Sequence, residues 1–209
     1  MARLSDVGKR PRLVIIVGVY LALWIVLSLH PVDRADWAME NVLVWLIWAV
    51  LVAGWRWFQF SDLSYFLIFG FLTLHEFGAH YTYDKVPLGY WLKDTFHFAR
   101  NDYDRIVHFS FGFCWAYPVR EFFLKSGRIP KAWSYYLPVS AVLAWSAVYE
   151  IIEAYTAQWF PGQEEQFVGM QGDIFDSQRD MTCALMGAVL CMVLVFLAQK
   201  RAEHEDSGP

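Results

Sequence analysis

The chain has 209 residues and a formal net charge of −4, and apolar residues dominate its composition. Hydrophobic residues, counting Tyr and Cys, make up 57% and charged residues 18%, against about 45–50% and about 25% in ordinary soluble domains. This balance excludes a disordered chain and disfavours a soluble globule, and the charge offers no basic surface for nucleic acid. The 11 Trp and 11 Tyr are typical of a protein in contact with the lipid bilayer.

Six apolar segments approach the roughly 20 residues needed to cross about 30 Å of hydrocarbon. They cover residues 13–30, 42–58, 63–80, 106–123, 133–153 and 180–199. Basic residues precede the first segment, but no small-residue cleavage pattern follows it, so we expect a retained helix rather than a signal peptide. The sequence therefore predicts an all-α fold, a single integral membrane domain over 1–209 with six transmembrane helices.

The distribution of Lys and Arg predicts the orientation. If the N-terminus is cytoplasmic, eleven Lys and Arg residues lie on the inner side and six on the outer side, and both termini are cytoplasmic. The first two segments lack the polar residues of the others, so we expect them to be a lipid-facing addition to a four-helix core. The connection 81–101 is rich in aromatic residues and predicts either a lid or an amphipathic segment that rests on the membrane.

Small residues recur at a regular spacing in the last segment. Cys183, Gly187 and Cys191 are four residues apart, a pattern that suits close packing of transmembrane helices. The three cysteines of the chain, Cys114 included, lie in apolar stretches and give no disulfide or metal-knuckle pattern.

Acidic and histidine side chains gather at the predicted outer ends of the last four segments. Such a residue costs about 2.5–3.5 kcal/mol at mid-span, so it needs a partner or a function. Within each group the residues are three, four or seven apart and share a helix face. The set comprises Glu76, His80, Asp104, His108, Glu150, Glu153, Asp173, Asp176 and Asp180. We expect these side chains to surround one outward-opening cavity, as in other helical bundles.

Simpler interpretations remain open for each residue. Asp104 and Asp180 are also suited to capping their helices, where the helix dipole favours a negative charge. A structural ion-pair network would explain His108 and Glu150, which lie a turn inside their apolar segments. His75 precedes His80 by five residues, which excludes the four-residue histidine spacing of the zincin motif.

A divalent metal ion would explain the excess of acids. Only Arg105 and Arg179 lie close in sequence, so two cations face seven carboxylates. Either several acids are protonated or a cation is bound, and the oxygen ligands with nearby histidines favour the cation. The ligand types do not distinguish Mg, Mn, Fe and Zn.

The leading hypothesis is a membrane-embedded, metal-dependent enzyme that acts at the outer leaflet on a lipid or lipid-linked head group. In this hypothesis Asp104, His108, Glu153 and Asp180 are catalytic, His75, Glu76, His80, Glu150, Asp173 and Asp176 bind the metal, and Arg105 and Arg179 bind the substrate. The alternatives are a proton- or cation-coupled transporter, which should carry polar residues through to the inner side, and a non-catalytic scaffold with an acidic network.

Three sequence blocks carry a resemblance to known families. They read His75-Glu76-x-Gly78-Ala79-His80-Tyr81-x-Tyr83, Asp102-Tyr103-Asp104-Arg105-x-x-His108-Phe109 and Gly172-Asp173-x-x-Asp176-x-Gln178-x-Asp180-Met181. The blocks resemble the YjdF-like family of bacterial inner-membrane proteins and, more distantly, the VanZ-like proteins. Relative to the VanZ-like pattern, Arg105, Glu153 and Asp180 replace Lys, Gln and Asn, which makes this site more acidic. The resemblance implies an inner-membrane location and supplies no reaction.

Overall fold

The computed structural model describes residues 8–127, 129–159 and 173–206, and the regular structure in these ranges is helical throughout. The helices in chain order are α1 Pro11–Ser28, α2 Arg34–Gly54, α3 Asp62–His80, α4 Pro87–Phe96, α5 Tyr103–Ser126, α6 Trp133–Trp159 and α8 Asp176–Asp206. The expected all-α fold is confirmed.

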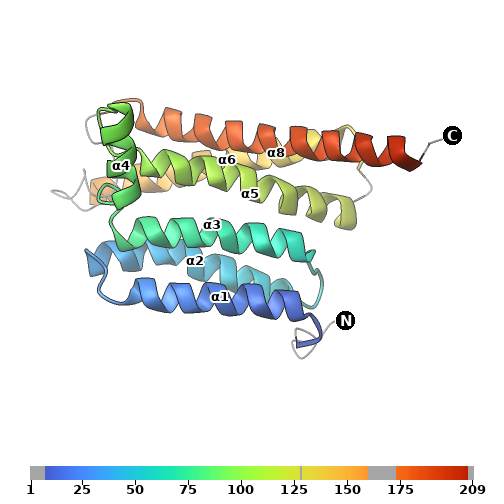
Figure 1. Ribbon diagram of the computed structural model, residues 1–209, viewed down its shortest axis with the longest axis horizontal. Coiled ribbons are helices and arrows are strands. Elements are labelled where there is room, and N and C mark those ends of the chain that lie inside the picture. Colours follow the sequence, from blue (N-terminus) through green and yellow to red (C-terminus); the bar gives the residue numbers. More distant parts are fainter. Residues whose placement is uncertain (1–7, 128, 160–172, 207–209) are drawn as a thin grey trace.

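The long helices form two groups that lie side by side. In Figure 1, α1, α2 and α3 make one group and α5, α6 and α8 make the other, and α3 packs directly against α5 between them. The short helix α4 crosses one end of the bundle, while both ends of the described chain lie at the opposite end (Figure 1). We call these the α4 end and the terminus end.

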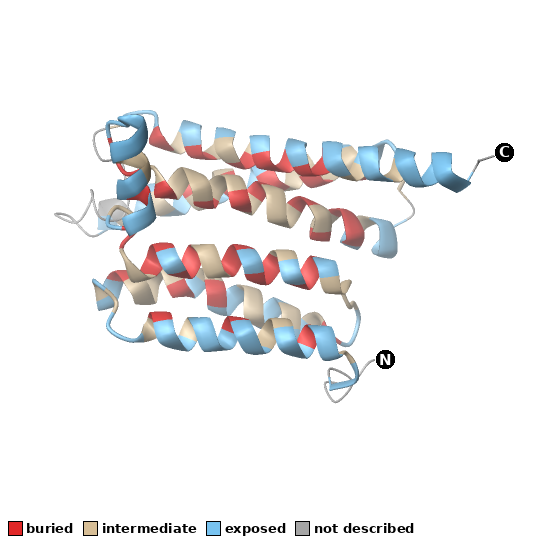
Figure 2. Ribbon diagram, in the orientation of Figure 1, coloured by how far each residue is buried: buried red, intermediate tan, exposed pale blue. Residues whose placement is uncertain are grey.

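Among the described residues, four helices are long and apolar enough to cross a membrane, namely α1, α2, residues 133–156 of α6, and α8. The other two long helices, α3 with 19 residues and α5 with 24, carry more polar side chains. Much of the bundle surface is exposed and apolar, which suits a protein surrounded by lipid (Figure 2). The helical membrane fold is therefore clear, and the count of six crossings stays a prediction.

Helix α2 begins eight residues before the predicted apolar segment, which was expected to start at residue 42. Asp33 caps this helix by accepting hydrogen bonds from the backbone N–H groups of Ala35 (2.8 Å) and Asp36 (3.1 Å). Its first two turns are polar and carry Glu40 and Asn41. The prediction missed them because it followed hydropathy alone.

Helices α1 and α2 pack against α3 through a few buried side chains. Tyr20 of α1 is buried and its ring lies 5.1 Å from that of Phe69 on α3. The Trp24 indole N–H of α1 donates to the Asn41 side-chain oxygen of α2 at 2.8 Å. Most of the surface of α1 and α2 nevertheless stays exposed, as expected for a lipid-facing addition.

Helices α5 and α8 approach each other closely at two glycines. A Cβ atom on Gly112 would lie 1.8 Å from the carbonyl oxygen of Ala184, and one on Gly187 would lie 2.1 Å from that of Phe109. Side chains larger than hydrogen therefore do not fit there. This confirms the predicted close packing at Gly187 and fixes the acidic residues of α8 against those of α5.

Candidate functional site

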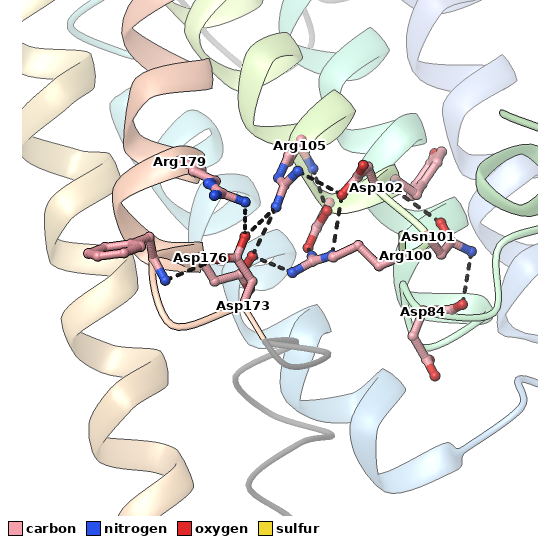
Figure 3. Close-up of polar contacts among 11 residues, drawn as sticks. Asp84, Arg100, Asn101, Asp102, Arg105, Asp173, Asp176 and Arg179 are labelled. Atoms are coloured by element: carbon pink, nitrogen blue, oxygen red, sulfur yellow. Dashed lines mark hydrogen bonds and ion pairs between the residues drawn. The ribbon is translucent and has the colours of Figure 1, made fainter. Parts of the chain in front are cut away.

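Charged side chains at the α4 end form a network that we call the rim. Its members are Arg100, Asp102, Asp104, Arg105, Asp173, Asp176 and Arg179. They come from the segment before α5, the first turn of α5, the residues before α8 and the first turn of α8. Figure 3 shows the arginines directed toward the carboxylates between them.

Arg100 occupies the centre of the rim. Its guanidinium pairs with Asp104 and Asp176 and lies 3.3 Å from the carboxylate of Asp102, while 7% of its side chain is exposed. Burial lowers the pKa of Arg100, but the neighbouring carboxylates outweigh this effect and raise the pKa above its ordinary value. Arg100 therefore remains charged and neutralises two acids that the sequence analysis left without a cation.

The two predicted substrate-binding arginines are also part of the rim. Arg105 lies 2.8 Å from both Asp102 and Asp173 and 3.7 Å from Asp176. Arg179 pairs with Asp173, and 55% of its side chain is exposed. Desolvation raises the pKa of Asp173, but the backbone N–H of Phe175 and the two arginines hold this pKa below its usual value. Asp173 is thus a charged acceptor.

A pocket of about 420 Å³ opens on the rim between Phe98 and the three arginines Arg100, Arg105 and Arg179. The rim is connected to α4 through Asn101, whose side-chain amide donates to the backbone oxygens of Asp84 (2.8 Å) and Val86 (3.1 Å). Figure 3 shows Asn101 between Asp84 and the rim. The pocket is therefore built at the junction of α4, α5 and α8.

Three residues below the rim form a candidate metal centre. His108 of α5, Glu150 of α6 and Asp180 of α8 each offer one ligand atom, and these atoms lie within 4.8 Å of one another. The His108 Nε2 atom is 3.6 Å from the Glu150 Oε1 atom. A nitrogen and two oxygens that converge from three helices match the way metal sites are built in helical bundles.

One oxygen atom of each carboxylate in this centre lacks a hydrogen-bond partner in the described part of the chain. Glu150 Oε1 and Asp180 Oδ1 are buried and accept no hydrogen bond there. Glu150 is 6% exposed and Asp180 is 4% exposed. Because a buried carboxylate oxygen without a partner is costly, these atoms fit a bound cation.

A second acidic group shares Asp180 with the candidate metal centre. Ligand atoms of Asp104, Asp176 and Asp180 also lie within 4.8 Å of one another. However, Asp104 and Asp176 already accept hydrogen bonds from Arg100. The group containing His108 is thus better suited to a cation, and Asp180 connects it to the rim.

Glu153 and Tyr149 surround Glu150 on α6. Glu153 follows Glu150 by three residues, one turn away on the same helix. The ring of Tyr149 lies 6.2 Å from that of His108, and its hydroxyl donates to Glu40 of α2 at 3.0 Å. The centre is therefore bordered by Glu40, a partly buried acid that the sequence patterns did not single out.

His75 belongs to this bordering cluster and not to the candidate metal centre. Its Nε2 atom is 3.8 Å from the Glu40 carboxylate, and its Nδ1 atom is 2.6 Å from the Tyr83 hydroxyl. We call Glu40, His75, Tyr83 and Tyr149 the α2–α3 polar cluster. It contains one of the predicted metal ligands.

Glu76 and His80 point toward the first two helices. Glu76 is buried, and its Oε2 atom accepts a 3.4 Å hydrogen bond from Asn41 of α2. The His80 Nδ1 atom lies 2.6 Å from the backbone oxygen of Leu27. The expectation of a single cavity is corrected here, because this face of α3 packs against α1 and α2 rather than toward α8.

Comparisons with known proteins agree with the membrane fold. Residues 12–201 match the family described as "Predicted membrane protein (DUF2238)". The chain is 36% identical over 171 residues to the inner membrane protein YjdF of Escherichia coli (strain K12). The aligned region covers 80% of this chain and 79% of that protein. No solved structure matches the chain. The YjdF-like resemblance is confirmed, and the VanZ-like resemblance stays a prediction. The chain belongs to the DUF2238 family of predicted membrane proteins.

Proposed function

We propose that this protein is a metal-dependent enzyme of the bacterial inner membrane that acts at the extracytoplasmic leaflet on a lipid or lipid-linked head group. The observation that carries the proposal is the candidate metal centre of His108, Glu150 and Asp180, next to the rim acids. The pocket on the rim is lined by three arginines together with Asp102 and Asp173. Asp180 joins the two, since its carboxylate is close to the centre and to the rim acids.

The orientation rests on two observations. Both ends of the described chain lie at the terminus end, as expected if both termini are cytoplasmic (Figure 1). The inner-side excess of Lys and Arg, eleven against six, favours the cytoplasm for that end. The rim and the candidate metal centre then face the extracytoplasmic side. The name of the YjdF relative supports the inner membrane as the location of the protein.

The side chains divide the chemistry between them. A divalent cation supplies Lewis acidity toward a phosphoryl or carbonyl oxygen when it is bound. Arg105 and Arg179 lie at the pocket and can exchange an aspartate contact for anionic oxygens of a head group. Because His108 and Asp180 are among the proposed metal ligands, Glu153, one turn from Glu150, is the group best placed to accept a proton. Asp104 holds Arg100 in the rim.

Metal analysis of the purified full-length protein tests the proposal. We expect about one divalent ion per chain, with loss of the ion in Glu150→Gln and Asp180→Asn. Glu76→Gln is the matched control, because Glu76 is a buried carboxylate outside the centre. Chelation should remove roughly 3–4 kcal/mol of stability, the amount that a ligand at 100–1,000 times its Kd contributes. Absence of stoichiometric metal together with a melting temperature indifferent to chelator would reject the enzyme.

One observation favours a proton-coupled transporter as the second candidate. The α2–α3 polar cluster adjoins the centre through Tyr149, and buried chains of acids and histidines can relay protons. A transporter requires proton flux in sealed proteoliposomes that Glu40→Gln abolishes. The enzyme requires no flux and a metal-dependent turnover of a head group.

A further inference from the structure

A second cavity lies at the terminus end, between α5, α6 and α8, and it belongs to no part of the candidate site. It measures about 460 Å³, and its polar lining includes Arg120, Lys131, Gln199, Glu203 and Asp206. The cavity is at the opposite end of the bundle from the rim. Any ligand it binds is therefore distinct from the proposed substrate.

Arg120 is the buried cation of this cavity. It is 6% exposed, its Nη2 atom donates to the Gln199 side-chain oxygen at 3.3 Å, and its guanidinium lies 4.8 Å from the centre of the Tyr135 ring. Its Nε atom is buried without a hydrogen-bond partner, and the described residues supply no carboxylate within ion-pair distance. The adjacent Glu121 instead accepts hydrogen bonds from Ser61 (2.8 Å) and from Lys125 (2.5 Å).

The contacts of Arg120 do not neutralise its charge. Gln199 is uncharged, and the hydroxyl of Tyr135 donates to the same Gln199 oxygen at 2.5 Å. Removing a cation from water costs several kcal/mol unless an anion accompanies it. A stacking contact with an aromatic ring returns only about 2 kcal/mol. The guanidinium is therefore suited to an anion from outside the chain.

The acids of the cavity lie at its mouth. Glu203 pairs with Lys131 at 2.5 Å, and their side chains are 62% and 67% exposed. Asp206 is also exposed, at the last residue of α8. These carboxylates are in water, one is neutralised by Lys131, and the buried wall near Arg120 stays positive.

We propose that this cavity binds the phosphate of an anionic phospholipid in the leaflet at the terminus end. A guanidinium binds phosphate oxygens through a planar pair of donors, and basic pockets between helices on the cytoplasmic side are typical sites for lipid head groups. Trp133 and Tyr136, at the start of α6, are exposed and mark the membrane interface beside the cavity. A phospholipid already in that leaflet reaches the cavity without crossing the bundle.

Thermal unfolding of the purified full-length protein tests the site. The protein is held in an uncharged detergent, and phosphatidylglycerol, phosphatidylcholine or inorganic phosphate is added at equal concentration. We expect a concentration-dependent rise in melting temperature with phosphatidylglycerol, and at least about fivefold weaker binding in Arg120→Gln. The matched control is Arg56→Gln, which removes an exposed arginine from the same end of the bundle and should bind as the parent does.

Each outcome decides the proposal. Without added lipid, Arg120→Gln should melt at or above the temperature of the parent, because the substitution removes a buried charge that lacks a counterion. If that variant does not fold, the comparison of the two lipids on the parent still tests the site. Equal shifts with both lipids, or equal binding by the parent and Arg120→Gln, would overturn it. A shift with inorganic phosphate as large as that with phosphatidylglycerol would assign the cavity to free phosphate instead.

Discussion

Arg100 connects carboxylates of α5 and α8 that would otherwise repel each other. It pairs with Asp104 and Asp176, and it is buried together with Asp176. When one partner of a buried ion pair is removed, the charge that remains has lost its compensation. The structural integrity of the rim therefore depends on this one side chain more than on the exposed arginines around it.

We predict that Arg100→Gln lowers the free energy of unfolding by about 3–5 kcal/mol, the usual cost of breaking a buried pair. Arg179→Gln is the control, because 55% of that side chain is exposed and such pairs contribute only about 0–1 kcal/mol. Denaturant unfolding in detergent micelles measures both variants. Equal stabilities for the two would show that the rim is a surface network without a central residue.

Residue patterns in the sequence singled out the three residues of the candidate metal centre but assigned only Glu150 to the metal, with His108 and Asp180 expected to be catalytic. They also missed the surroundings of the centre. His108, Glu150 and Asp180 were identified because they are ionisable, lie in or at the edge of apolar segments and share faces with other polar residues. Arg100 was not, since it precedes α5 and its only local signal is its position four residues before Asp104. The spacing of Glu76 and His80 placed them on one face of α3, but spacing does not reveal which neighbour that face meets.

At the scale of the helices, two glycines determine the geometry of the candidate metal centre. Gly112 and Gly187 bring the backbones of α5 and α8 into contact, and His108 and Asp180 lie on these two helices. A methyl group at either glycine would overlap a carbonyl oxygen of the partner helix. The helices would have to separate, and their ligands with them.

We predict that Gly112→Ala and Gly187→Ala each destabilise the protein by about 1–3 kcal/mol, the usual cost of overpacking, and lower its metal content. Gly70→Ala is the control, since a methyl group there meets no atom within 4 Å. Alanine is also the better helix former by up to about 1 kcal/mol, so the control should be neutral or stabilising. Thermal unfolding and metal analysis on the same samples check both effects. Unchanged metal content in the destabilised variants would show that metal binding does not depend on the close contact of α5 and α8.

Helix existence was predictable from hydropathy, and helix bounds were not. Each long helix in the described ranges contains one of the predicted apolar segments, because a stretch of about 20 apolar residues is typical of a helix that crosses a membrane. Hydropathy did not predict the polar first turns of α2, which carry Glu40 and Asn41. A helix extends beyond its apolar stretch when a cap such as Asp33 satisfies its free N–H groups. The short helix α4 lies in the connection 81–101 and starts at Pro87, a residue that favours the first helical position.

For the whole molecule, charge is separated between the two ends of the bundle. The rim pairs three arginines with four aspartates, whereas the carboxylates of the candidate metal centre have no arginine or lysine partner among the described residues. At the terminus end the buried Glu121 is paired with Lys125, whereas the buried cation Arg120 has no acidic partner among the described residues. One end of the bundle therefore suits a cation and the other an anion, and both interpretations depend on which end faces the cytoplasm.

Cysteine labelling in whole cells tests that orientation. In a chain whose native cysteines Cys114, Cys183 and Cys191 are replaced by alanine, Asp94→Cys places a thiol on α4 and Glu205→Cys places one near the end of α8; both positions are exposed. We predict that a membrane-impermeant maleimide labels Asp94→Cys in intact cells and labels Glu205→Cys only after permeabilisation, since the Lys/Arg bias puts the terminus end in the cytoplasm.

The reverse labelling pattern would turn the candidate metal centre toward the cytoplasm and require a cytoplasmic substrate. Labelling of both thiols in intact cells would mean that α4 and the end of α8 lie on the same side, which a bundle with these two elements at opposite ends does not allow (Figure 1). Labelling of both after permeabilisation is the control that each thiol is accessible. The experiment thus decides the orientation before any substrate is known.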